Sequence, residues 1–209
     1  MSKIKILLLD CSPKLEGSAS RYFTDLLIPK LAEAGSSDVE LKRRSLGSEP
    51  LPAMTADYAE SVLLLLEDAQ QKFATSLALS DELIKELDEC DVLWISTPVH
   101  NFTIPATLKN WIDYVVRRDV TFVSTKEGKK GLLRDRPTFV AVTSGGAMFE
   151  DPPRQPDFFR PYLKAILSVI GLSDITFIQA TGLAFTKSPL STVEDSATRW
   201  ICEVRHPSA

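Results

Sequence analysis

The chain has 209 residues, of which 44% are hydrophobic, and this size and composition favour one α/β domain over residues 1–209. Its 24 basic and 28 acidic residues leave a net charge of −4, which excludes the broad basic surface of a nucleic-acid-binding protein. The three cysteines are scattered and no apolar run is long enough to span a bilayer, so we expect a cytoplasmic protein without a disulfide framework, a metal motif or membrane insertion.

The N-terminal part of the chain predicts a strand, a loop, a helix and a second strand. Ile4–Leu9 is apolar nearly throughout, which is typical of a central parallel strand buried on both faces. The loop Asp10–Ser20 leads into a helix that should end at Gly35. Pro29 lies inside this helix and is expected to kink or break it. Val39–Leu46 alternates well enough to predict a second strand.

A helical insert is predicted before the third strand. It follows the turn-rich stretch Gly47–Thr55, and the spacing of apolar residues predicts a helix over Asp57–Phe73. Ser80 resembles the N-cap of another helix, or a joint within one, that continues to Leu87. Asp91–Ser96 is short and apolar, as expected of a buried third strand.

The stretch Thr97–Phe122 combines a loop with an amphipathic helix. The loop Pro98–Phe102 is polar and rich in turn-forming residues. Beyond it, Val120–Ser124 and Gly131–Leu133 predict a β-hairpin excursion with Gly128 in its turn. Between the loop and the hairpin, the sequence predicts a helix whose apolar face carries Ile104, Leu108, Trp111, Ile112 and Val115.

The remainder of the chain predicts two more strands and two more helices. Thr138–Thr143 is the fourth sheet strand, and a Pro-rich loop, Asp151–Pro156, leads to a helix over Phe159–Ile170. Ile175–Ala180 is the fifth strand and Val193–Val204 the last helix. This alternation predicts a doubly wound five-stranded parallel sheet with helices on both faces, and right-handed crossovers favour the strand order 2-1-3-4-5.

In this strand order, the loops after the first, third and fourth strands meet at one edge of the sheet. Such edges bind ligands where the winding reverses. In the first loop, Ser12, Ser18, Ser20 and the start of the helix offer hydroxyls and amides that suit a phosphate. The loop lacks the glycine patterns of nucleotide hydrolases and of dinucleotide crevices. Serines are also common in plain turns and caps, so this loop alone leaves phosphate binding open.

The other two loops suit a flat polar ring. One supplies main-chain groups around Asn101 together with Phe102, and the other supplies Ser144, Gly145 and Gly146. Paired glycines let the backbone approach a planar ring closely. A phosphate seat next to two such loops indicates FMN, while ordinary turns at strand ends remain the alternative.

Nearly the whole chain resembles the FMN-dependent azoreductases, also described as NADH:quinone oxidoreductases, which have a flavodoxin-like fold. The likeness is strongest over Pro98–Phe122, which is similar to the family's Pro-Met-Tyr-Asn-Phe, Leu-Lys-Asn/Asp-aromatic and Val-Thr-Phe segments. The Ser12 loop and Pro161-Tyr162-Leu163 also match. The matching residues of the strongest stretch are Asn101, Phe102, Ile104, Pro105, Leu108, Lys109, Asp113, Val120, Thr121 and Phe122.

The resemblance implies a flavodoxin-like FMN-binding domain with NADH as the electron donor, and a homodimer in which each partner completes the other's active site. We expect ping-pong transfer of two electrons to a flat acceptor, namely a quinone, an azo dye or a nitroaromatic compound. The phosphate of FMN would be held by Ser12, Ser18, Ala19 and Ser20. The ring would be bordered by Pro98, Val99, His100, Asn101 and Phe102. Its polar edge would be covered by Ser144, Gly145, Gly146 and Ala147.

The chain departs from the family pattern at three places. Val99-His100 replaces the family's Met-Tyr, and Ser144-Gly145-Gly146-Ala147 replaces Ser-Arg-Gly-Gly, so that a cation near the ring is lost. Met148-Phe149 stands where relatives often carry His or Tyr. These departures bear on the choice of substrate and on the flavin potential rather than on FMN binding.

A non-enzymatic flavodoxin-type electron carrier for a protein partner is the alternative function. The mild net charge argues against it, as do the hairpin Val120–Leu133 and the insert Asp57–Leu87, which suggest a built-up pocket and a dimer surface. No side chain need act as a nucleophile. His100 either donates a proton to the reduced acceptor or fills a packing slot, and we favour packing. For Cys11 we favour a buried spacer over a reactive thiol.

Overall fold

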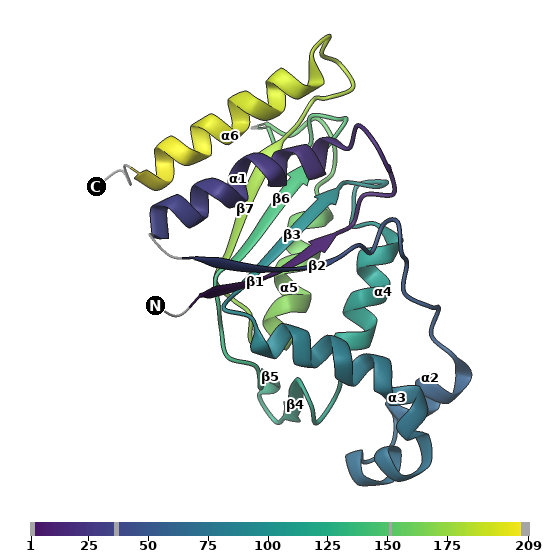
Figure 1. Cartoon of the computed structure of the whole chain (residues 1–209). Helices are drawn as coiled ribbons and strands as arrows, with labels where there is room; N and C mark the ends of the chain where they lie inside the picture. The colour runs from purple at the N-terminus through teal and green to yellow at the C-terminus, as the bar shows by residue number, and fades with distance from the viewer. Residues whose placement is uncertain (1–2, 36–37, 151, 206–209) are drawn as a thin grey trace.

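A five-stranded parallel sheet forms the centre of the computed structural model, which describes residues 3–35, 38–150 and 152–205 (Figure 1). The strand order is β2-β1-β3-β6-β7, which confirms the predicted order 2-1-3-4-5. Parallel pairing along the whole sheet brings the carboxyl ends of the strands to one edge. The strands are β1 (Ile4–Asp10), β2 (Val39–Arg44), β3 (Val92–Pro98), β6 (Thr138–Thr143) and β7 (Ile175–Ala180).

Helices cover both faces of the sheet, with α1 and α6 side by side on one face and α3, α4 and α5 on the other (Figure 1). Successive residues of β1 point to opposite faces, so Leu7 and Leu9 join one core while Ile6 and Leu8 join the other. This explains why Ile6–Leu9 of the strand is a continuous apolar run. The helices are α1 (Ala19–Gly35), α2 (Ala56–Ser61), α3 (Leu66–Glu89), α4 (Ala106–Val115), α5 (Phe159–Val169) and α6 (Pro189–Arg205).

The helical insert differs from its prediction. The helix expected over Asp57–Phe73 is wrong, because the chain leaves the helical path between α2 and α3, and α3 then runs through Ser80 with a kink at Phe73 (φ −128°, ψ 27°). Ser80 is therefore not a cap. Its buried hydroxyl donates to the Tyr114 carbonyl at 2.7 Å, and the Tyr58 hydroxyl donates to the same carbonyl at 3.2 Å. α2 and α3 are therefore each hydrogen-bonded to α4. The spacing of apolar residues along the sequence could not predict these contacts.

The hairpin also differs from its prediction. Its strands are β4 (Phe122–Thr125) and β5 (Gly128–Gly131), and Thr125 pairs with Gly128. The turn is therefore Lys126-Glu127, and Gly128 opens the second strand with φ 124°, a value that glycine tolerates. Figure 1 shows the hairpin at the end of the sheet opposite the carboxyl ends of the strands. Within this chain the hairpin therefore does not build a pocket at the ligand edge, contrary to expectation.

Two element boundaries change the composition of the ligand edge. β3 continues to Pro98, which pairs with Thr143, so the loop predicted from Pro98 begins at Val99. The last helix, α6, begins at Pro189 instead of Val193, because proline suits the first helical position.

α1 remains helical through Pro29, so the predicted break is absent. Asp151, in the predicted Pro-rich loop, lies outside the described residues.

Candidate functional site

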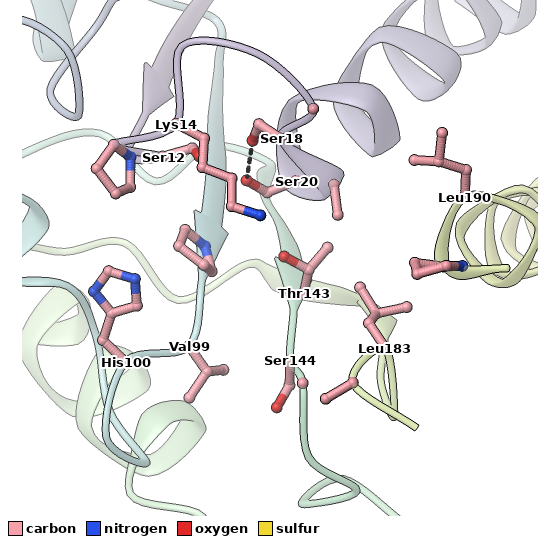
Figure 2. A pocket seen from close by; sticks show the side chains of 17 residues that line it. Ser12, Lys14, Ser18, Ser20, Val99, His100, Thr143, Ser144, Leu183 and Leu190 are labelled. Atoms are coloured by element: carbon pink, nitrogen blue, oxygen red, sulfur yellow. Dashed lines mark hydrogen bonds between the residues drawn. The ribbon is translucent and has the colours of Figure 1, made fainter. Parts of the chain in front are cut away.

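A cavity of about 540 Å³ lies at the carboxyl edge of the sheet, a size that is typical of small-molecule sites (Figure 2). The loops after β1, β3 and β6, which are the first, third and fourth sheet strands along the chain, meet there, as predicted from the topology. The predicted site residues that line the cavity are Ser12, Ser18, Ala19, Ser20, Pro98, Val99, His100, Ser144 and Gly145.

Four predicted residues do not line this cavity. Asn101 lines a neighbouring cavity of about 470 Å³, which also borders on His100 and so adjoins the first. Phe102 is 41% exposed, and Gly146 packs against the Gln155 side chain. Ala147 accepts a hydrogen bond from the Arg154 main-chain N–H at 3.4 Å. Of these four residues, Gly146 and Ala147 therefore already use main-chain groups in contacts within the protein.

Buried hydroxyls gather where the first loop enters α1. Ser18 Oγ lies 3.3 Å from Ser20 Oγ (Figure 2). The Ser18 hydroxyl also accepts from the Arg21 main-chain N–H at 3.3 Å. Ser12 is buried as well, and its hydroxyl has no partner in the described part of the chain. Long hydrogen bonds and an unpaired hydroxyl leave donors that a ligand in the cavity can use.

An arginine holds this loop in place from below. Arg21 Nε donates to the buried Asp10 carboxylate at 2.7 Å, and its Nη1 donates to the Lys14 and Leu15 carbonyls at 3.1 and 2.9 Å. Arg43 adds a second contact to Asp10 at 3.3 Å. The guanidinium of Arg21 thus joins the end of β1 to the loop.

Cys11, next to this loop, is fully buried, as predicted. Its thiol donates to the Leu9 carbonyl at 3.8 Å. Burial, reinforced by the neighbouring Asp10 carboxylate, raises the pKa of the Cys11 thiol far above its ordinary value. The thiol is therefore protonated at neutral pH, which agrees with a spacer and not with a nucleophile.

The loop after β3 is a tight two-residue turn. His100 and Thr103 exchange main-chain hydrogen bonds of 3.0 Å in both directions, while Asn101 (φ 48°) and Phe102 (φ 68°) occupy the left-handed region. This is the pattern of a type I′ turn, in which asparagine is favoured. The main-chain N–H groups of Asn101 and Phe102 have no acceptor among the described residues, so both are free to donate to a ligand.

A fourth loop, after β7, lines the cavity and was not predicted. The main-chain N–H groups of Leu183 and Ala184 donate to the carbonyls of Ser144 and Gly145, each at 3.1 Å. Figure 2 shows Leu183 and Leu190 across the cavity from Val99 and His100. A Cβ atom at Gly145 would lie 3.3 Å from that of Ala184, so the loop fills space next to the missing arginine. The sequence signal for this loop was Pro189. Proline is favoured at the first position of a helix, so it marks where the loop ends and α6 begins.

None of the helices in the described ranges combines the length and the apolar character needed to cross a bilayer.

Comparison with known proteins gives concordant matches. The sequence fits a family described as having a flavodoxin-like fold over residues 4–202. FMN-dependent NADH:quinone oxidoreductase 4 of Pseudomonas fluorescens is 42% identical over 192 residues, which cover 92% of this chain and 91% of that protein. FMN-dependent NADH:quinone oxidoreductase 5 of Burkholderia lata is 43% identical over 179 residues, which cover 86% and 85%.

A solved structure supports the fold. An FMN-dependent NADH-azoreductase of Bacillus anthracis, determined in complex with FMN, superposes with a TM-score of 0.77 over 96% of this chain and 99% of its own. At 22% identity, this likeness concerns the fold alone.

Proposed function

The chain belongs to the flavodoxin-like family of FMN-dependent NADH:quinone oxidoreductases, and on this basis we propose that it uses FMN to pass electrons from NADH to quinones and to azo and nitro compounds. The observation that carries the proposal is the convergence of three chemically different loops on one cavity. Buried serine hydroxyls lie at one end of the cavity. The type I′ turn at Asn101-Phe102, with its free main-chain N–H groups, lies beside the cavity, and the loop with Gly145 and Gly146 forms another side.

The cavity suits FMN in its charge and in its chemistry. None of the described residues that line it is acidic, so nothing there repels a phosphate. Ser12, Ser18 and Ser20 would hold the phosphate together with the first amides of α1. The amides of Asn101 and Phe102 would donate to the polar edge of the ring, and Gly145 would let the ring approach the main chain.

Bound FMN supplies the redox chemistry, accepting hydride from NADH and passing two electrons to the second substrate in a separate, ping-pong half-reaction. The protein's own part is to position the flavin and its substrates and to exclude water from them. Val99, Leu183 and Leu190 give the cavity apolar walls. The neighbouring cavity shares His100 and is lined by Asn101, Ile104 and Tyr162, so a flat acceptor seated there would lie next to the ring.

His100 stands where the two cavities meet, and we propose that it packs between their occupants while protons come from water. A homodimer with shared sites and a cytoplasmic location complete the proposal. They rest on the family resemblance and on the scattered cysteines. Light scattering after gel filtration tests the dimer, because a monomeric mass for active enzyme would contradict it.

The decisive experiment is spectroscopic. Purified protein should be yellow or become yellow with one equivalent of FMN, and NADH under argon should bleach it. Menadione should then restore the colour. Double-reciprocal plots of rate against menadione concentration, at several fixed NADH concentrations, should be parallel lines, as ping-pong kinetics require. Protein that binds FMN but oxidises NADH only when a protein partner is added would instead be an electron carrier. Protein that binds no FMN would overturn the proposal.

A further inference from the structure

Lys14 is the cation of the larger cavity. Among the described residues that line it, Lys14 is the only lysine, and none is an arginine, an aspartate or a glutamate. Figure 2 shows its side chain extending into the cavity, with its ammonium group directed toward the Ser18–Ser20 pair. A lysine stem is long and flexible, so the ammonium can follow a ligand without movement of the backbone.

The ammonium of Lys14 is free to pair with a ligand. It makes no ion pair or hydrogen bond within the described ranges. The nearby carboxylate, that of Asp10, is 2% exposed and already contacts Arg21 and Arg43. Arg21 does not line this cavity, and its Nε and Nη1 atoms already donate to Asp10 and to the loop carbonyls.

The backbone beneath Lys14 is held firmly. Its carbonyl accepts from Arg21 Nη1 at 3.1 Å, and the adjoining Leu15 carbonyl accepts from the same atom at 2.9 Å. The root of the side chain is therefore fixed beside the serine hydroxyls. The hydroxyls and the amides of α1 are neutral donors, and neutral donors alone balance a phosphate dianion incompletely when it leaves water.

We propose that Lys14 is the charge partner of the FMN phosphate and that it makes the cavity select FMN over riboflavin, an inference that rests on the proposed function for the identity of the cofactor. Lys14 pairs with the phosphate after the serines and the helix start have positioned it. Riboflavin has the same ring and lacks the phosphate, so it gains nothing from the ammonium. The pair is partly exposed, and a charge-assisted contact of this kind changes affinity by about tenfold.

The test compares two ligands on one apoprotein. Quenching of flavin fluorescence gives the Kd of FMN and of riboflavin for the wild type and for Lys14→Gln. We expect the FMN Kd of the variant to rise about tenfold and its riboflavin Kd to change less than about twofold. Lys14→Arg should restore most of the FMN affinity, because the charge returns. Lys126→Gln, in the hairpin turn at the opposite end of the sheet, is the matched control and should bind both flavins like the wild type.

Salt gives an independent reading. Raising the ionic strength from about 0.05 M to about 0.5 M should weaken FMN binding to the wild type more than to Lys14→Gln, since only the wild type holds the ion pair.

Four outcomes decide the matter. A selective loss of FMN affinity with rescue by arginine supports the proposal. Equal weakening of FMN and riboflavin makes Lys14 a structural residue and overturns it. Unchanged FMN affinity with a raised KM for NADH moves the cation to the second substrate and also overturns it. Wild-type protein that binds no FMN removes the proposed function itself, and the wild-type titration shows this separately.

Discussion

Arg21 and Asp10 form an ion pair, 2.7 Å from Nε to Oδ2, at the point where the end of β1 meets the start of α1. The carboxylate is 2% exposed and the Arg21 side chain 22% exposed, so the pair is largely shielded from water. The same guanidinium binds two carbonyls of the intervening loop. The shape of the hydroxyl-bearing loop thus depends on one side chain that lies beneath it.

Replacing Arg21 with glutamine should therefore weaken both the fold and flavin binding. Asp10 would lose its nearer partner but keep Arg43, so we expect a loss of about 2 kcal/mol in the free energy of unfolding, less than for an isolated buried pair. Urea denaturation of the apoprotein measures this loss. FMN and riboflavin should both bind several-fold more weakly, because the loop is no longer preorganised. Arg154→Gln, at an 81% exposed side chain, is the control. Unchanged stability in Arg21→Gln would contradict this account.

Two glycines make a matched test of backbone packing around the site. A Cβ atom at Gly47 would overlap the Ser12 carbonyl, which is main chain and cannot move without the loop. At Gly146 the obstacle is the end of the Gln155 side chain, which can rotate away. Gly47→Ala should cost about 2 kcal/mol of stability or more and weaken FMN binding, while Gly146→Ala should cost less than about 1 kcal/mol. Thermal unfolding followed by flavin titration compares them, and equal losses would contradict the prediction.

The two buried thiols should be unreactive in the native protein. Burial raises the pKa of Cys11 and of Cys90 above their ordinary value, although for Cys90 contact with Arg136 opposes the shift. The neutral thiols therefore stabilise the fold fully below the unfolded pKa of about 8.5, and this contribution falls as the pH rises above it. In a Cys202→Ser background, Ellman's reagent at pH 8 should count no thiol in the native protein and both in urea. Rapid native labelling of Cys11 would revive its reactive interpretation.

His100→Phe distinguishes packing from proton donation. Phenylalanine fills a similar flat space and carries no proton to donate. If His100 packs, the variant should keep kcat for menadione within about threefold of the wild type, with an unchanged pH profile from pH 5 to 8. If the imidazole is the acid, kcat should fall by about a hundredfold or more and the profile should lose one limb. Stopped-flow reoxidation of the reduced enzyme separates this step from reduction by NADH.

Much of the fold was readable from local pattern. The run Ile4–Leu9 is apolar on both faces because β1 lies between two helical layers, and Thr138–Thr143 and Ile175–Ala180 were predicted with the bounds that the structure shows. The alternation of strands and helices then left few ways to order a parallel sheet. Because that order determines which loops share an edge, most of the predicted cavity lining followed from the sequence alone.

Other features depended on contacts between distant segments. α2 and α3 each donate a hydrogen bond to the Tyr114 carbonyl on another helix, and Leu183 and Ala184 join the fourth wall of the cavity to the Ser144–Gly145 main chain. Periodicity records which face of an element is buried, but it does not record which neighbour buries it. The sequence by itself therefore determined the layers and the edge where a ligand binds. Only the tertiary structure decided which charged side chains pair within the protein, as Arg21 does with Asp10, and which are left to pair with a ligand, as Lys14 is.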